Sequence, residues 1–90
     1  MNIKKLFDLS DRTIIITGAA GNLGSKYAEG LSQAGANLVL ADLDYASCKK
    51  LGKQLESKYS TKTLAVKLDL TNKISIKNMV SKSMKEFSKI

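Results

Sequence analysis

The stretch that most constrains the fold is residues 12–24, RTIIITGAAGNLG, in which an apolar run passes directly into a glycine-rich segment. Three consecutive isoleucines are typical of a strand buried on both faces, so we predict a central parallel strand over residues 12–17. Gly18, Gly21 and Gly24 follow at intervals of three, where a tight turn and the start of a helix are expected. A strand that runs through glycines into a helix indicates a parallel α/β sheet.

The order of strand and helix repeats along the rest of the chain. Short apolar runs at residues 37–41 and 63–68 predict a second and a third strand, although Lys67 interrupts the third. Three sets of apolar residues at helical spacing are expected to face the sheet. They are Leu23, Tyr27, Leu31 and Ala34; Cys48, Leu51, Leu55 and Tyr59; and Ile76, Val80, Met84 and Phe87.

The predicted helix ends carry residues with the matching capping preferences. Gly35 is expected to end the first helix. Either of two aspartates, Asp42 or Asp44, is expected to cap the second helix, and Thr71 or Asn72 the third.

The connections between the predicted strands are long enough for crossovers. We therefore predict an α/β fold with a parallel sheet made of three strand-helix units, which is half of a complete doubly wound sheet. Its strand order is 3-2-1, which leaves the first strand as an open edge, with two helices on one face and the third on the other. The chain has no proline and no linker-like stretch, so residues 1–90 are expected to form a single partial domain.

The glycine-rich turn suits a phosphate group, because backbone N–H groups and the positive end of a helix dipole meet there. Its spacing is neither G-x-G-x-x-G nor that of a P-loop, so the turn alone is equally compatible with a structural connection. Asp42 follows Gly24 by eighteen residues, near the offset at which an acid binds an adenosine ribose. A carboxylate there repels a 2′-phosphate and favours NAD over NADP, unless Asp42 is simply a cap or a turn acid.

Three motifs in register, together with a lead-in segment before the first of them, resemble the N-terminal part of the short-chain dehydrogenase/reductase family. The lead-in segment is LFDLSDR (6–12), and the motifs are TGAAGNLG (17–24), LADLD (40–44) and KLDLT (67–71). Within the family, sugar-modifying and flagellin-modification-type oxidoreductases are the most similar. The resemblance implies a Rossmann fold that binds NAD(P), in a protein that transfers hydride between NAD(H) and an alcohol or carbonyl substrate.

The resemblance also assigns positions in the site. The turn bearing Gly18, Gly21, Asn22, Leu23 and Gly24 would lie under the pyrophosphate. The carboxylate of Asp42 would bind the adenosine ribose. The adenine pocket would be lined by Asp69 and the backbone of Leu70. Many members have glycine where this chain has Asn22, whereas Gly21 matches the extended branch, so the branch is left open.

The family's chemistry uses a serine, a tyrosine and a lysine, the last two spaced Tyr-x-x-x-Lys downstream of an Asn-Asn-Ala-Gly motif that this chain does not contain. Tyr45 and Lys49 match that spacing by coincidence, because their place in the family's pattern is the adenosine end of the cofactor. Tyr45 is expected to flank the adenine. We therefore assign no catalytic residue and expect the chain to be a fragment. Cys48 lies on the apolar face of its predicted helix and is expected to be a core residue.

Composition excludes several classes of protein. The chain has no histidine and one cysteine, which argues against a zinc site and against Ser-His-Asp or Cys-His catalysis. Residues 49–90 carry eleven lysines against three acids, a balance that also occurs in nucleic-acid-binding and membrane-binding proteins. Because these lysines are dispersed and only two aromatic residues, Tyr59 and Phe87, lie between them, we expect neither partner. The N-terminus does not resemble a secretory signal, so we expect a cytoplasmic protein.

Two functions therefore follow from the sequence. The first is the cofactor-binding part of an NAD-dependent short-chain oxidoreductase, which meets its small-molecule substrate only in a full-length form and, as usual in the family, forms homo-oligomers. The alternative is a non-catalytic half-Rossmann module that binds a nucleotide or docks a partner.

Overall fold

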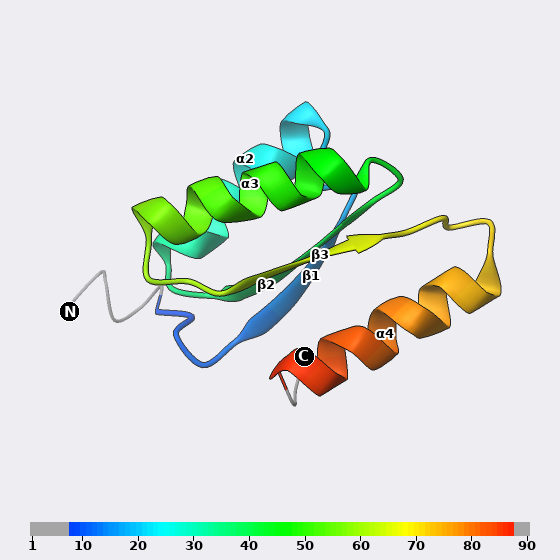
Figure 1. Ribbon diagram of the computed structural model, residues 1–90. Coiled ribbons are helices and arrows are strands. Elements are labelled where there is room, and N and C mark those ends of the chain that lie inside the picture. The colour runs from blue at the N-terminus through cyan, green and yellow to red at the C-terminus, as the bar shows by residue number, and fades with distance from the viewer. Residues whose placement is uncertain (1–7, 88–90) are drawn as a thin grey trace.

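The computed structural model describes residues 8–87, which form a parallel sheet between two layers of helices (Figure 1). The lead-in segment begins at Leu6, so its first two residues lie outside this range. The elements in chain order are β1 (Thr13–Thr17), α2 (Asn22–Gln33), β2 (Asn37–Asp42), α3 (Tyr45–Lys58), β3 (Thr63–Lys67) and α4 (Lys73–Phe87). The predicted α/β fold of three strand-helix units is confirmed.

The strand order is β1-β2-β3, with both pairs parallel, as predicted. Within the described residues β1 pairs with β2 alone, so the expected open edge is present. The central strand of the three is therefore β2, and the prediction that β1 is central is wrong for this part of the chain. As a consequence Ile14 and Ile15 are only partly buried, whereas Leu38–Ala41 of β2 are completely buried.

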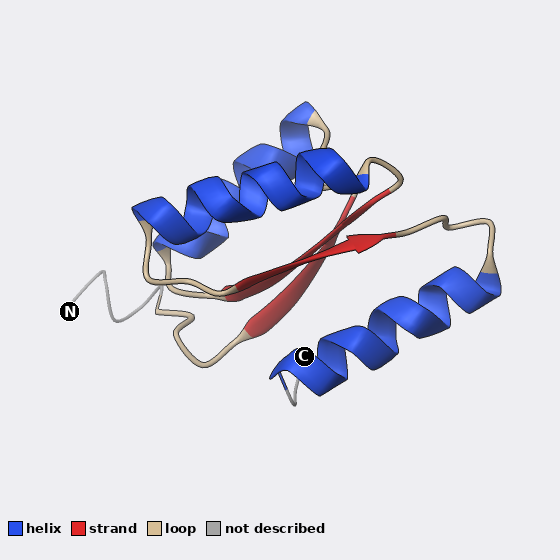
Figure 2. Ribbon diagram, in the orientation of Figure 1, coloured by secondary structure: helices blue, strands red, loops and turns tan. Residues whose placement is uncertain are grey.

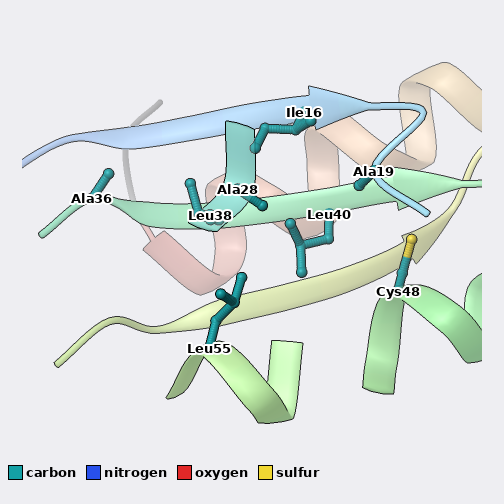
Figure 3. Packing of buried hydrophobic residues seen from close by; sticks show 8 residues of the cluster. All are labelled: Ile16, Ala19, Ala28, Ala36, Leu38, Leu40, Cys48 and Leu55. Carbon is teal, nitrogen blue, oxygen red and sulfur yellow. The ribbon is translucent and has the colours of Figure 1, made fainter. Parts of the chain in front are cut away.

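Side chains of β2 alternate between the two faces of the sheet. Leu38 and Leu40 pack with Cys48 and Leu55 of α3 and with Ala28 of α2 in a cluster shown in Figure 3. Val39 and Ala41 face the other way, in a second cluster with Met79 of α4. Figure 2 shows the resulting layers, with α2 and α3 on one side of the sheet and α4 on the other, as right-handed crossovers require.

The inner faces of two helices differ from those predicted. Leu23 and Tyr27 of α2 are 62% and 58% exposed, while Ala28 and Ser32 are buried against the sheet. The reason is that small side chains let α2 lie close to the strands, so its contact face is displaced from the bulky residues.

The same displacement occurs on α4. Met79 and Ser83 are buried, whereas Val80 and Met84 are 43% and 45% exposed. Ile76 and Phe87 are partly buried against the second cluster, as expected. The predicted face of α3 is confirmed at Cys48 and Leu55, and Gly52 joins it.

Hydrogen bonds fix the helix ends. Gly35 follows α2 with φ +96°, and the N–H groups of Gly35 and Ala36 donate to Ser32 and Leu31, a Schellman motif. Of the two capping alternatives at each helix, Asp44 caps α3 and Asn72 caps α4. No helix in residues 8–87 is both long and apolar enough to cross a membrane.

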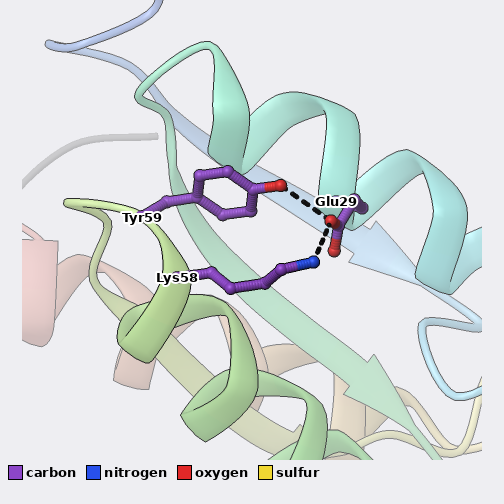
Figure 4. Close-up of polar contacts among 3 residues, drawn as sticks. All are labelled: Glu29, Lys58 and Tyr59. Carbon is purple, nitrogen blue, oxygen red and sulfur yellow. Dashed lines mark hydrogen bonds and ion pairs between the residues drawn. The ribbon is translucent and has the colours of Figure 1, made fainter.

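A polar cluster ties α2 to the end of α3 (Figure 4). The Glu29 carboxylate accepts hydrogen bonds from the Tyr59 hydroxyl at 2.7 Å and from the Lys58 ammonium at 2.9 Å. These two bonds, the Tyr59 hydroxyl first, lower the pKa of Glu29. In turn, the Glu29 carboxylate raises the pKa of both Lys58 and Tyr59.

Candidate functional site

The candidate site lies where the carboxyl ends of the three strands meet, the edge at which open α/β sheets bind ligands. A shallow pocket of about 270 Å³ opens there. Its lining comes from the carboxyl end of β2 and from the segments that follow the three strands: Gly18, Ala41, Asp42, Leu43, Leu68, Asp69, Leu70 and Thr71. Four of the predicted site residues, Gly18, Asp42, Asp69 and Leu70, thus line one pocket.

The other four predicted residues lie beside this pocket, on the turn and the first turn of α2. Gly21 is the N-cap of α2, and Asn22, Leu23 and Gly24 are its first three residues. The Gly21 N–H donates to the Gly18 carbonyl at 3.1 Å and closes the turn. Gly18 has φ +69°, a conformation that other residues rarely adopt.

Gly24 is required by close packing. A Cβ atom at Gly24 would overlap the Gly18 carbonyl oxygen and would lie 3.0 Å from the Ala19 Cα. The lack of a side chain at Gly24 therefore lets α2 approach the backbone that follows β1.

The start of α2 is the one helix start in residues 8–87 without a side-chain cap. Gly21 has no side chain to accept from the first N–H groups of α2, whereas Asp44 accepts from Ser47 N–H and Asn72 from Ile74 N–H. The first N–H groups of a helix need an acceptor, and an anion at this place also interacts favourably with the helix dipole. The helix start beside the pocket is thus the one in the described part of the chain whose first N–H groups receive no side-chain cap.

Asp42 ends β2 with a partly buried carboxylate. One oxygen, Oδ2, accepts from the Ala20 N–H of the turn at 3.1 Å, and Oδ1 accepts from the Asp44 N–H at 3.0 Å. Asp42 therefore does not cap α3. The turn is also held to β2 by the Ala19 N–H, which donates to the Ala41 carbonyl at 3.2 Å.

Asp69 organises the third strand end. Its carboxylate accepts from the Thr71 hydroxyl at 2.6 Å and from the Thr71 N–H at 2.9 Å, and these bonds lower the pKa of Asp69. The Asp69 N–H donates to the Ser75 hydroxyl of α4 at 3.0 Å. The carboxylate thus stays ionised at neutral pH, and Asp69 lines the same pocket as Asp42.

The sequence indicated Thr71 only as a candidate helix cap, and we predicted neither its place in the pocket nor the hydrogen bond from Ala20 to Asp42. The Asp-x-Thr spacing at residues 69–71 is a turn signal that would have indicated Thr71. No local signal indicates the second contact, because Ala20 and Asp42 are 22 residues apart.

Tyr45 is not among the residues that line the pocket, although it and Lys49 lie on the first turns of α3. Cys48 is completely buried, and burial, with Asp42 and Asp44 contributing, raises the pKa of its thiol to about 11. A thiol in that state is a core group and a poor nucleophile. Within the described residues no group of three His, Cys, Asp or Glu side chains is placed to hold a metal ion.

Comparison with known proteins identifies the family. Residues 12–90 match the family described as short chain dehydrogenase. An NADP-dependent 3-hydroxy acid dehydrogenase of Schizosaccharomyces pombe is 35% identical over 91% of this chain and 32% of its own length. An NAD-dependent glycerol dehydrogenase of Listeria innocua is 34% identical over 96% of this chain and 32% of its own length.

Solved structures agree. An oxidoreductase of Haemophilus influenza with bound NAD is 31% identical, with a TM-score of 0.86 over 96% of this chain and 30% of that one. A short-chain type dehydrogenase/reductase from Mycobacterium marinum is 26% identical, with a TM-score of 0.87 over 98% of this chain and 35% of that one. The chain spans about a third of the length of these relatives. It belongs to the short-chain dehydrogenase/reductase family, an NAD(P)-binding family of oxidoreductases, and corresponds to its N-terminal Rossmann part.

Proposed function

We propose that this chain is the cofactor-binding part of an NAD-dependent short-chain oxidoreductase. The observation that carries the proposal is the uncapped start of α2 beside a pocket that Asp42 and Asp69 line. The backbone of the turn from Gly18 to Gly24 holds the pyrophosphate. Asp42 accepts from the hydroxyls of the adenosine ribose, while Asp69 and the backbone of Leu70 line the adenine pocket.

Asp42 makes NAD the preferred cofactor. A carboxylate accepts hydrogen bonds from a free 2′-hydroxyl but repels a 2′-phosphate. The relatives include both an NADP-dependent and an NAD-dependent enzyme, so family membership leaves the choice open and the charge at this position supports NAD.

Bound NAD supplies a nicotinamide ring that accepts or donates hydride. We assign none of the residues of this chain to proton transfer at the substrate. A full-length form therefore acts on its alcohol or carbonyl substrate with the family's Ser-Tyr-Lys residues. We also propose a cytoplasmic protein without nucleic-acid or membrane partners, which forms homo-oligomers as is usual in the family.

Calorimetric titration of the 90-residue chain with NAD⁺ and with NADP⁺ tests the cofactor assignment. We expect NAD⁺ to bind more tightly, and the preference to shrink in Asp42→Asn because the repelling charge is gone. Asp11→Asn, which removes a carboxylate just before β1, is the matched control and should keep the preference. Absence of saturable binding by either cofactor would overturn the proposal.

A second experiment separates the oxidoreductase from a non-catalytic nucleotide-binding module. Sequencing the transcript beyond codon 90 is expected to show a frame that continues into Asn-Asn-Ala-Gly and a downstream Tyr-x-x-x-Lys. A stop codon directly after Ile90, together with measurable NAD⁺ binding, would favour the module.

A further inference from the structure

The Asp42 carboxylate has a second connection that its expected contact with a ribose does not explain. Both of its oxygens already accept hydrogen bonds from backbone N–H groups, Oδ2 from Ala20 and Oδ1 from Asp44. Ala20 lies in the middle of the glycine-rich turn, and Asp44 is the N-cap of α3. One side chain thus joins the turn to the segment between β2 and α3.

We propose that Asp42 is a positioning residue that fixes the glycine-rich turn in its phosphate-binding shape before a nucleotide arrives. Three hydrogen bonds hold the turn. They run from Gly21 N–H to the Gly18 carbonyl, from Ala19 N–H to the Ala41 carbonyl and from Ala20 N–H to Asp42. The Ala20 bond alone depends on a side chain, so it is the one that a substitution removes. The role of Asp42 toward a ligand rests on the proposed function, whereas the bond to Ala20 is a property of the free chain.

The two roles of Asp42 are compatible because of the number of acceptor sites on a carboxylate. An ionised carboxylate offers about four lone-pair sites, of which the Ala20 and Asp44 N–H groups occupy two. Two sites remain, which matches the two adjacent hydroxyls of a ribose. The nucleotide can therefore bind without releasing the turn, and the carboxylate couples the ribose contact to the phosphate contact.

This coupling has a measurable consequence. If Asp42 only bound ribose hydroxyls, its removal would not change the affinity for a nucleotide that lacks them. If Asp42 also holds the turn, its removal weakens the binding of the diphosphate itself. Adenosine diphosphate and its 2′,3′-dideoxy analogue separate the two cases, because they differ only in those hydroxyls.

The experiment measures the affinity of both nucleotides for wild type, Asp42→Ala and Asp42→Asn by calorimetry. We expect Asp42→Ala to weaken both, with a several-fold loss for the dideoxy analogue. Asp42→Asn is isosteric, and its amide oxygen can still accept from the Ala20 N–H, so it should recover part of the dideoxy affinity. Asp44→Ala is the control, since it removes an equal charge and the cap of α3 without touching the turn. An unchanged dideoxy affinity in Asp42→Ala would overturn the proposal.

Hydrogen exchange in the free chain tests the bond without a nucleotide. We expect the Ala20 amide to exchange about tenfold faster in Asp42→Ala than in wild type, the effect of losing one hydrogen bond, and unchanged in Asp44→Ala. Equal Ala20 exchange in wild type and Asp42→Ala would contradict the positioning role. Faster Ala20 exchange together with no binding of either nucleotide would support the positioning of the turn while overturning the proposed function, so the two failures are distinguishable.

Discussion

Two glycines of α2, Gly24 and Gly30, differ in the space that surrounds them. At Gly24 a side chain would overlap the backbone of Gly18 and Ala19. At Gly30, in the exposed middle of α2, no atom lies within 4 Å of an added Cβ. The two positions lie on one helix, so they form a matched pair.

We expect Gly24→Ala to lower the free energy of unfolding by about 1–3 kcal/mol, because the methyl group meets backbone that cannot move aside cheaply. Gly30→Ala should raise it by about 0.5–1 kcal/mol through the higher helix propensity of alanine. Urea denaturation of both variants measures the difference. Equal effects of the two substitutions would show that the contact at Gly24 is not tight.

Glu29 makes stability depend on pH. Hydrogen bonds from Tyr59 and then Lys58 lower the pKa of Glu29 below its ordinary value of 4.5. A carboxyl group with a lowered pKa stabilises the folded chain above its unfolded pKa, and this contribution is lost as the pH falls through the folded value. The raised pKa values of Lys58 and Tyr59 add a contribution that is lost at the alkaline end.

We therefore expect Glu29→Gln to lower the Tm at pH 7, and the difference from wild type to shrink near pH 4.5 and to disappear as the pH falls through the lowered pKa of Glu29. Thermal unfolding followed by circular dichroism between pH 3 and pH 7, a range of about four units around the carboxyl pKa, measures this. Glu86→Gln on α4 is the control, because Glu86 makes no ion pair within residues 8–87. A Tm difference that persists at low pH would contradict the assignment.

At the scale of the elements, the start of α2 lacks the stabilising hydrogen bond of a side-chain cap, because its N-cap residue is Gly21. Gly21 has φ −77° and ψ 167°, the extended geometry in which aspartate and asparagine cap helices well. A Cβ there would lie 3.4 Å from the Gly18 carbonyl oxygen, an ordinary contact. The fold therefore accepts a side chain at Gly21, and under the proposed function the glycine keeps this helix start free for the pyrophosphate.

We expect Gly21→Asp and Gly21→Asn each to raise the free energy of unfolding by about 0.5 kcal/mol through the new cap. Both should weaken NAD⁺ binding, and the aspartate more strongly, because its charge repels the pyrophosphate. Denaturation and calorimetry of the same preparations separate the two effects. If both variants bound NAD⁺ as wild type does, the pyrophosphate would not lie at this helix start.

The strands could be predicted from the sequence more accurately than the buried faces of the helices. The strands were predictable because β-branched and aliphatic runs stand between glycine and capping residues. The buried faces of α2 and α4 were not predictable from the spacing of bulky apolar residues. Ala28, Ser32 and Ser83 lie on these faces because they are small, and a search for bulky apolar residues does not find them.

The sequence was sufficient to predict which strand ends form the candidate site. Parallel strands bring Gly18, Asp42 and Asp69 to one edge whatever the details of packing. The bonds from Ala20 to Asp42 and from Tyr59 to Glu29 join residues 22 and 30 positions apart, and only the folded chain brings them together.

At the scale of the whole molecule, the outer edge of β1, which no strand of residues 8–87 pairs with, coexists with a net charge of +7. Asn37 N–H donates to the Arg12 carbonyl, so by the alternation of a parallel strand Thr13, Ile15 and Thr17 direct their backbone groups away from β2. Such an edge favours pairing with another chain. The lysines oppose this association at low ionic strength, and salt screens their repulsion over roughly 10 Å at 0.1 M.

We therefore expect the 90-residue chain to self-associate more strongly as salt rises, as measured by sedimentation velocity across a series of concentrations. Thr17→Lys should reduce the association several-fold, because Thr17 is the exposed residue of β1 and lysine on an edge strand disfavours pairing. Ile74→Lys adds the same charge at an exposed position of α4, far in sequence from the edge, and should have the smaller effect. If both substitutions acted equally, net charge and not the β1 edge would control the association. A nucleic-acid contaminant held by the lysines would give the opposite salt dependence, since such binding weakens as salt rises.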